Sequence, residues 1–425
     1  MNIKDLYKIY LTHNKVITDT RNVVANCIFF ALRGPNFNGN TFAAEALANG
    51  AAYVVVDDPA YCQLHNAILV DDCLTTLQQL AKYHRQQFSI PFIAITGSNG
   101  KTTSKELVYA VLALKYTTYT TKGNLNNHIG VPLTILSIPV NAQMAVIEMG
   151  ANHQQEIASY CTYTLPTHGV ITNCGKAHLE GFDGVEGVKK GKGELYDYLR
   201  AHNGTAFVMQ DYDYLMHMSQ GIAQLYTYGT ANANLVGTVS HNEPFLHVHI
   251  PALHIHIHTQ LVGAYNLPNV LLAAAIGTFF QVEAHLIKQA IEHYAPSNSR
   301  SQLVQSGTNH IILDTYNANP SSMQLAIQNF AALQATNKIL FIGEMAELGQ
   351  SSHIEHTAII ELIQSLQFST VILVGSQFKP FSNLYVWFAS SKDAQDWYQI
   401  QNFNNAHILI KGSRSTAMEK VIAPL

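Results

Sequence analysis

Residues 93–114 read IAITGSNGKTTSKELVYAVLAL. An apolar strand, a glycine-containing loop and a helix follow one another there, in the order typical of phosphate-binding loops in α/β proteins. Gly97 and Gly100 allow a tight turn with exposed N–H groups, Lys101 offers a charge to the β and γ phosphates, and Thr102 offers a hydroxyl to Mg²⁺. The pattern predicts an NTP site formed by Gly97, Ser98, Asn99, Gly100, Lys101, Thr102 and Thr103.

The spacing of this loop differs from the longer GxxxxGK[ST] pattern. Ile95 stands where that pattern has its first glycine, so the match is to the shorter form TGxxGKT. A glycine turn beside a surface lysine is the alternative interpretation. The strand before the loop and the helix after it favour the nucleotide site.

Composition limits the classes of protein that fit the chain. Its 425 residues predict two to four domains at roughly 100–200 residues each. Charged residues make up only 12%, against roughly 25% in typical soluble proteins, and the net charge of -4 predicts neither a nucleic-acid partner nor an anionic membrane. The first residues, MNIKDLYKIYLTHNK, lack the apolar run of a signal peptide. The longest apolar run, near 270–280, is shorter than the roughly 20 residues of a membrane span.

The cysteines indicate the expected compartment. There are five, with no CxxC pair, which predicts neither a disulfide framework nor a zinc site and favours a reducing cytoplasm. We expect a cytoplasmic monomer without membrane insertion.

Strand and helix patterns alternate along the whole chain, which predicts an α/β fold. A small first domain, 1–85, holds the strands CIFFAL and AAYVVVDD. A second domain, 86–297, begins near the strand PFIAIT and ends after the helical segments 264–280 and 286–294. A third domain, 298–425, contains HIILDTYN, KILFIG, TVILVG and AHILIKG, which predict another parallel sheet. It lacks GxGxxG, so dinucleotide binding there is not expected.

Seven segments of the chain resemble the Mur ligase family. Besides TGSNGKTT they are TDTRNVVANCIFFALRGPNFNG, KGNLNNHIGVPLTIL, IEMGANHQQEI, AHLEGF with KGKGEL, DTYNANPSSM and KGSRSTAMEKV. The resemblance implies a UDP-sugar-binding α/β domain, a central P-loop ATPase-type domain and a C-terminal Rossmann-like domain. It also implies the member that uses ATP to join D-alanyl-D-alanine to UDP-MurNAc-tripeptide through an acyl phosphate, in peptidoglycan precursor synthesis. Whether the third residue of the tripeptide is diaminopimelate or lysine is left open.

The same resemblance assigns catalytic and metal-binding roles. Glu148 ends the apolar strand MAVIEMG, where a carboxylate meets Mg²⁺ beside a phosphate loop. His178 resembles a second ligand, and Lys192 aligns with the lysine that carries CO₂ as a carbamate. The alternative interpretations are a helix cap for Glu148, a turn residue for His178 and a solvated basic helix face for Lys192. The resemblance implies two Mg²⁺ ions held by Thr102, Glu148, His178 and Lys192, with Lys101 also catalytic.

The other site residues are implied by resemblance too. Asn124, Asn126 and Asn127 precede an apolar segment expected to be a strand. Tyr265 stands where the family has His near adenine. The further ATP-binding residues are Asn266, Asn269, Arg300 and Asp314. The substrate-binding residues are Asp19, Thr20, Arg21, Arg33, Asn124, Asn126, Asn127, Tyr316, Asn317, Asn319, Lys411, Ser413 and Arg414.

The segment HVHIPALHIHIHT, 247–259, has histidines at alternate positions, as a chelating strand face would. A half-exposed hairpin gives the same alternation. Because charged residues are scarce, we expect these histidines to be surface polar groups and predict no metal there.

Two rival functions fit parts of the pattern. A sibling ligase, adding the third amino acid or acting as a folylpolyglutamate synthase, shares the phosphate loop, but the DNPR element of the amino-acid-adding sibling is absent. A non-catalytic NTP switch would not need Glu148, His178 and Lys192 together.

Overall fold

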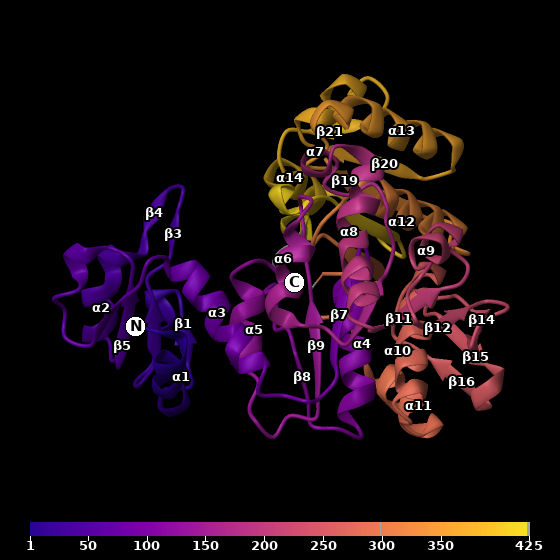
Figure 1. The fold of residues 1–425 in the computed structure, drawn as a ribbon. Coiled ribbons are helices and arrows are strands. Elements are labelled where there is room, and N and C mark those ends of the chain that lie inside the picture. Colours follow the sequence, from indigo (N-terminus) through magenta and orange to yellow (C-terminus); the bar gives the residue numbers. More distant parts are fainter. Residues whose placement is uncertain (298, 423–425) are drawn as a thin grey trace.

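Three sheets built mainly from parallel strands follow one another along the chain in the computed structural model, which describes residues 1–297 and 299–422 (Figure 1). Helices pack on each sheet, so the predicted α/β class is confirmed. One apolar core runs from the N-terminal helices through the central sheet to the C-terminal sheet. A second core lies on the other face of the C-terminal sheet, because neighbouring β19 residues such as Leu340 and Phe341 belong to different cores.

The N-terminal sheet has the order β1-β2-β5-β6, all parallel. Its strands are β1 (Val16–Ile17), β2 (Ile28–Phe30), β5 (Tyr53–Val56) and β6 (Ala67–Leu69), with the helices α1 (Ile3–Thr12), α2 (Ala43–Ala48) and α3 (Cys73–Arg85). A separate hairpin joins β3 (Arg33–Gly34) to β4 (Phe37–Asn38). Figure 1 shows this indigo unit at one side of the molecule, linked by α3 to the central part.

The central sheet has the order β13-β12-β11-β10-β7-β9-β8, all parallel. Its strands are β7 (Phe92–Thr96), β8 (Thr118–Thr120), β9 (Met144–Glu148), β10 (His168–Ile171), β11 (Thr205–Met209), β12 (Gln224–Gly229) and β13 (Leu235–Val236). Every residue of β7, β9 and β11 is buried, as expected for strands covered on both faces. The register places Ile95 beside Glu148 on one side and Val170 on the other. The three strands therefore end together, at the edge where the phosphate loop begins.

Helices connect and cover these strands. They are α4 (Lys101–Ala113), α5 (Gly130–Leu136), α6 (Glu156–Thr164), α7 (Leu179–Phe182), α8 (Gly184–Ala201), α9 (Asp213–Met218), α10 (Leu267–Phe279) and α11 (Ala284–His293). The expected strand after Asn127 is wrong, because Gly130–Leu136 forms the helix α5. Among the described residues, no helix combines the length and the apolar character that a bilayer span requires.

The histidine-rich segment forms part of a small antiparallel sheet, as the hairpin prediction stated. It contains β14 (Thr238–His241), β15 (His247–Ile250) and β16 (Ile255–His258). His247 stacks on His258 with ring centroids 4.2 Å apart, and His249 stacks on His256 at 4.1 Å. The opposite face is apolar, because Val248, Ile250 and Ile257 are fully buried.

The C-terminal sheet has the order β17-β18-β22-β19-β20-β21. Its strands are β17 (Gln302–Ser306), β18 (Asn309–Asp314), β19 (Lys338–Gly343), β20 (Thr370–Val374), β21 (Val386–Phe388) and β22 (His407–Lys411), and its helices are α12 (Pro320–Ala332), α13 (Ser352–Ser365) and α14 (Ser391–Ile400). The purely parallel sheet expected from the sequence needs one correction. β17, a short polar strand, pairs antiparallel with β18 at the edge.

Candidate active site

A cleft of about 810 Å³ lies where the central sheet meets the C-terminal sheet. That volume is within the usual range for small-molecule sites. The cleft brings together the following residues predicted from the sequence: Ser98, Asn99, Gly100, Lys101, Thr102, Thr103, Asn124, Asn126, Asn127, Glu148, His178, Asn266, Asn269, Arg300, Asp314, Tyr316, Asn317, Asn319 and Lys411.

The two loop glycines are required by close packing and by backbone conformation. A Cβ on Gly97 would lie 2.0 Å from Oγ1 of Thr172, and one on Gly100 would lie 2.6 Å from Oδ1 of Asn269. Gly100 has φ of 77°, a left-handed conformation that favours glycine, and it is the residue before the first turn of α4. The loop therefore turns directly into the helix, which leaves N–H groups of the first turn pointing toward the cleft.

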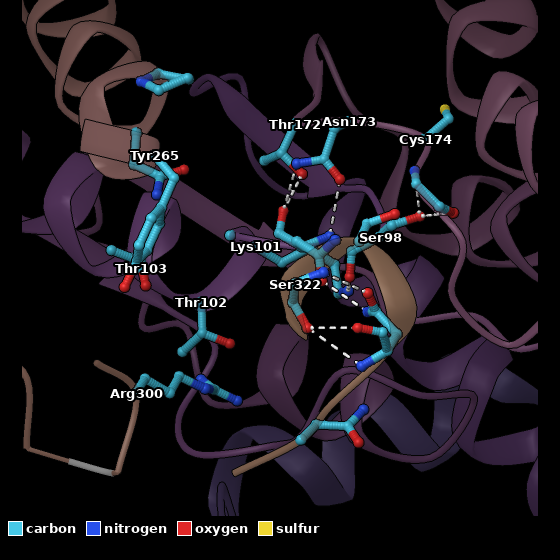
Figure 2. A pocket seen from close by; sticks show the side chains of 18 of the residues that line it. Ser98, Lys101, Thr102, Thr103, Thr172, Asn173, Cys174, Tyr265, Arg300 and Ser322 are labelled. Carbon is cyan, nitrogen blue, oxygen red and sulfur yellow. Dashed lines mark hydrogen bonds between the residues drawn. The ribbon is translucent and has the colours of Figure 1, made fainter. Parts of the chain in front are cut away.

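Residues after β10 hold the loop from the side, and no sequence motif marks them. The backbone N–H of Asn99 donates to Oδ1 of Asn173 at 3.0 Å, and Oγ1 of Thr172 donates to the carbonyl of Asn99 at 2.6 Å. Figure 2 shows Thr172 and Asn173 next to the loop that carries Ser98 and Lys101. The signal that could have found them is their position directly after a buried parallel strand beside β7.

Lys101 folds back onto its own loop. Its Nζ donates to the carbonyls of Gly97 at 2.6 Å and Ser98 at 3.1 Å. The pKa of Lys101 is lowered to about 8, mainly by burial; the charge of Glu148 opposes this shift and the charge of Arg300 adds to it. An anion in the cleft would favour the charged form of this lysine.

Glu148 lies at the end of β9 and is 1% exposed. Its Oε1 accepts from Nδ2 of Asn126 at 2.7 Å and from the hydroxyl of Thr102 at 3.1 Å. Its Oε2 is buried and has no hydrogen-bond partner among the described residues. A buried carboxylate oxygen without a partner is costly, so this site suits a cation.

His178 and Lys192 differ in their relation to the cleft. His178 lines it, and its Nδ1 lies 2.6 Å from Oε2 of Glu347, which lowers the pKa of that glutamate. Lys192 is buried in α8 outside the cleft lining, with its Nζ donating to the carbonyl of Ala151 at 2.8 Å and 4.7 Å from the ring of Phe182. Burial lowers the pKa of Lys192 to about 7.

The asparagines at the start of α10, Asn266 and Asn269, take part in a chain of side-chain hydrogen bonds. Ser104 donates to Oδ1 of Asn269 at 2.9 Å, and Asn269 donates to Oδ1 of Asn266 at 2.9 Å. Tyr265 shares a hydrogen bond of 2.8 Å with Ser301 in the linker to the C-terminal sheet. The guanidinium of Arg300 lies 3.6 Å from the ring centroid of Tyr316.

The C-terminal sheet contributes the ends of two adjacent strands. Asp314 and Lys411 are register partners in β18 and β22, and Nζ of Lys411 lies 2.5 Å from Oδ2 of Asp314. Nδ2 of Asn319, at the start of α12, donates to Oδ1 of Asn99 at 2.7 Å, which joins this sheet directly to the phosphate loop. Ser413 and Arg414 lie outside the cleft lining; the Ser413 hydroxyl donates to the carbonyl of Glu344 at 2.7 Å.

The four residues predicted in the first domain lie apart from this cleft lining. Arg21 pairs with Asp19, and Nε of Arg33 donates to Oδ1 of Asp57 at 2.7 Å. Thr20 lies between Asp19 and Arg21 in a short 3-10 turn. Asp57 is a buried partner that the sequence did not indicate. It also accepts from the side chain of Asn40 at 2.8 Å.

Comparison with known proteins gives the family. The Mur ligase middle domain matches residues 95–277, and the Mur ligase glutamate ligase domain matches residues 299–414. A protein of Escherichia coli (strain K12) named UDP-N-acetylmuramoyl-tripeptide--D-alanyl-D-alanine ligase is 34% identical over 98% of this chain and 94% of its own length. The chain belongs to the Mur ligase family. As a Mur ligase it is an ATP-dependent ligase.

Solved Mur ligase structures share the whole architecture. MurF from Acinetobacter baumannii has a TM-score of 0.87 and 30% identity, covering 96% of this chain and 92% of that chain. MurF ligase from Thermotoga maritima in complex with ADP has a TM-score of 0.84 and 25% identity, covering 97% and 96%. Both likenesses include all three sheets, which confirms the predicted three-domain α/β class of this Mur ligase.

Proposed function

We propose that the chain joins D-alanyl-D-alanine to UDP-MurNAc-tripeptide with ATP, giving UDP-MurNAc-pentapeptide, ADP and phosphate. The observation that carries the proposal is the single cleft in which the phosphate loop, Glu148, His178 and the strand ends of the C-terminal sheet meet. The relatives of Escherichia coli and Bacillus subtilis, at 34% and 32% identity, have names that describe this reaction. The sibling ligases and the NTP switch are not favoured.

The reaction has two steps. A carboxylate oxygen of the tripeptide attacks the γ phosphorus, the bond from that phosphorus to the β–γ bridging oxygen breaks, and ADP leaves. The amine of the dipeptide then attacks the acyl carbon, loses a proton and displaces phosphate. Lys101 and the N–H groups of the loop would bind the phosphate oxygens, and Arg300 would add a cation from the linker. Asn266, Asn269 and Asp314 would line the rest of the ATP site.

The site residues fit a Mg²⁺ ion. The unpartnered Oε2 of Glu148 and the Thr102 hydroxyl bonded to the same carboxylate are hard oxygen donors. Within residues 1–297 and 299–422 no group of three His, Cys, Asp or Glu side chains is placed to hold a metal alone. Mg²⁺ at NTP sites generally uses one or two protein ligands plus phosphates and waters. Bound there, the ion would neutralise charge on the phosphates. His178 and Lys192 would serve a second ion.

A carbamate on Lys192 is a further part of the proposal. A pKa of about 7 leaves a large share of the amine uncharged at neutral pH, and an uncharged amine adds CO₂ and releases a proton to form a carbamate. The side chain would have to turn from the carbonyl of Ala151 to bring this group to the cleft. Lys192→Ala should nearly abolish turnover, with partial recovery in added short-chain carboxylic acids. Full activity of the variant would remove Lys192 from the mechanism.

The substrates would meet from opposite sides of the cleft. Asp19, Thr20, Arg21 and Arg33 would bind the UDP-sugar on the N-terminal unit, and Asn124, Asn126 and Asn127 would line the path of the tripeptide. Tyr316, Asn317, Asn319, Lys411, Ser413 and Arg414 would serve the dipeptide side. We also propose that the three domains span residues 1–85, 86–297 and 298–425, and that the protein is a cytoplasmic monomer.

One assay tests the proposed function. The purified chain receives ATP, Mg²⁺ and UDP-MurNAc-tripeptide with D-alanyl-D-alanine or with other amines, and ADP and the pentapeptide product are measured by chromatography and mass. Lys101→Ala is the inactive control. Absence of product with D-alanyl-D-alanine contradicts the assignment. Comparing precursors that carry diaminopimelate or lysine identifies the third residue.

A further inference from the structure

Arg33, in the hairpin of the N-terminal unit, is held by one edge of its guanidinium group. Its Nε donates to Oδ1 of Asp57 at 2.7 Å. Nη2 lies 3.6 Å from Oδ2 of Asp58, too far for a hydrogen bond, and Nη1 makes no hydrogen bond within residues 1–297 and 299–422. The side chain is 47% exposed. The two terminal nitrogens are therefore available to an anion, and their paired N–H groups match the oxygens of a phosphate.

A buried network fixes the carboxylate of Asp57. This residue follows directly on β5, and its side chain is only 6% exposed. Oδ1 also accepts from Nδ2 of Asn40 at 2.8 Å, and Oδ2 accepts from the N–H of Cys73 at 3.2 Å, in the first turn of α3. The backbone N–H of Asp57 donates back to Oδ1 of Asn40 at 3.1 Å, and Asn40 is fully buried. The partner of Arg33 is thus held by three different parts of the N-terminal unit.

The same network keeps Asp57 charged. Burial alone would raise the pKa of Asp57, but the hydrogen bonds from Asn40, Cys73 and Arg33 outweigh it, so the pKa is lowered. The start of α3 contributes to this effect, because a helix N-terminus favours negative charge. A charged acceptor also forms a stronger hydrogen bond with a guanidinium than a neutral acceptor does. A neutral asparagine at position 57 would therefore hold Arg33 less firmly.

The pair lies at the edge of the N-terminal sheet where a ligand is expected. Strands β2 and β5 are parallel neighbours, Arg33 follows β2 by three residues, and Asp57 follows β5 by one. Open α/β sheets bind ligands just beyond the carboxyl ends of their strands. Figure 1 shows the hairpin β3–β4, which carries Arg33, extending from the indigo unit. The topology therefore places a fixed cation at a ligand-binding edge.

We propose that Asp57 is a positioning residue, which holds Arg33 by Nε so that the two terminal nitrogens bind the diphosphate of the UDP-sugar. Asp57 itself does not touch the substrate. A long arginine side chain that is ordered before the ligand arrives loses less conformational entropy on binding, so the affinity is higher. The identity of the ligand rests on the proposed function, whereas the hold of Asp57 on Arg33 does not.

The sign of one substitution separates positioning from a simple charge effect. Asp57→Asn removes a negative charge beside the site, so electrostatics alone predicts tighter binding of a diphosphate. Loss of positioning predicts the opposite, a Kd for UDP-MurNAc-tripeptide raised by about 3- to 10-fold. Asp58→Asn is the matched control, because it makes the same charge change beside the same arginine without breaking a hydrogen bond to it. Its Kd should be equal to or below that of the wild type. Calorimetric titration of the full chain without ATP measures both variants.

A double variant excludes a merely structural effect. Arg33→Ala should itself raise the Kd by about tenfold or more. In that background Asp57→Asn should add less than about twofold, because no arginine is left to position. In Asp57→Asn alone, kcat and the KM for ATP should stay close to the wild type, since both depend on the central cleft. A Kd in Asp57→Asn at or below that of the wild type, or an equal loss with and without Arg33, overturns the proposal.

The Nε–H group of Arg33 reports the contact without any ligand. In a chain labelled with ¹⁵N-arginine, its NMR signal is identified by its loss in Arg33→Lys. Exchange of this proton with water should be faster in Asp57→Asn than in the wild type, whereas Asp58→Asn should leave the rate unchanged. An unchanged rate in Asp57→Asn overturns the proposal.

The binding data also distinguish this proposal from the proposed function. If the wild type binds UDP-MurNAc-tripeptide but forms no pentapeptide with ATP and D-alanyl-D-alanine, the proposed function fails, and the Kd values still decide the role of Asp57. A wild type that does not bind UDP-MurNAc-tripeptide overturns both.

Discussion

Gly100 connects the phosphate loop to α4, and both its conformation and its surroundings exclude a side chain. Gly100→Ala should therefore lose about 1 kcal/mol of stability through its left-handed backbone and should also lower ATP-dependent turnover at least tenfold, because the new Cβ displaces Asn269. Gly307→Ala is the matched control, with φ of 59° and open space around it. Thermal unfolding and ADP release measure both variants. Equal losses of turnover would contradict this interpretation.

Arg300 is held by the ring of Tyr316, and no acid among residues 1–297 and 299–422 forms an ion pair with it, so the ring decides where the cation lies. Tyr316→Leu should raise the KM for ATP several-fold, because a stacked cation is worth about 0.5–2 kcal/mol. Tyr316→Phe keeps the ring and should stay close to the wild type. Initial rates at varied ATP provide the measurement. A KM in Tyr316→Phe as high as in Tyr316→Leu would assign the effect to the hydroxyl.

Among single residues, those that belong to motifs could be predicted from the sequence. Those that only the fold brings to the site could not. The spacing TGxxGKT identified Lys101 and Thr102 because each residue type there has a chemical reason. Thr172, Asn173 and Asp57 belong to no motif, and the hydrogen-bond partners of their side chains lie 16 to 76 residues away in the chain. Only the folded sheet shows that they meet the loop or the arginine.

Among the elements, the two errors have different physical causes. GVPLTIL, 130–136, is an apolar run too short for its period to distinguish a buried strand from a buried helix. Asn127 accepts from the N–H groups of Ile129 and Gly130 and so starts the helix α5, which packs on α3. QLVQS, β17, is a polar edge strand without the apolar signal of the central strands.

His168 opens β10 and is surrounded by Phe207, Phe279 and Phe280, and burial lowers its pKa to about 4. In the unfolded chain the pKa of a histidine is about 6.5. Between the folded and the unfolded pKa, the unfolded state therefore binds more protons than the folded state. The contribution of His168 to the stability of the folded chain is complete above about pH 6.5, where the ring is uncharged in both states, and is lost as the pH falls toward 4. His168→Leu should therefore show a smaller fall in Tm between pH 7 and pH 5 than the wild type. Equal falls would show that His168 does not contribute to the acid sensitivity.

In the whole molecule, the layered α/β class followed from alternating patterns, but the docking of the halves did not. That docking includes side-chain pairs separated widely in sequence, such as Asn99 with Asn319 and Lys176 with Glu355. No periodicity marks such pairs. Resemblance to a family indicated that the halves would meet, and the structure supplied the contacts.

The pair Lys176–Glu355 gives a test of docking. Lys176→Glu and Glu355→Lys should each lower the compactness of the full chain in small-angle scattering and reduce ligation several-fold, because each places like charges together. The double variant should recover most of both, since it restores opposite charges. A double variant as impaired as the worse single variant would show that the pair does not hold the halves together.

The contacts of the phosphate loop also set an order of events during translation. The loop is made at residues 97–100, its neighbours at 172–175 follow some 75 residues later, and Asn319 follows 220 residues after Asn99. At about 5–20 residues per second, the ribosome needs about 10–45 s to supply that last partner. A nascent chain therefore carries an incomplete phosphate loop until Asn319 has been made, and we expect tight nucleotide binding only after that point.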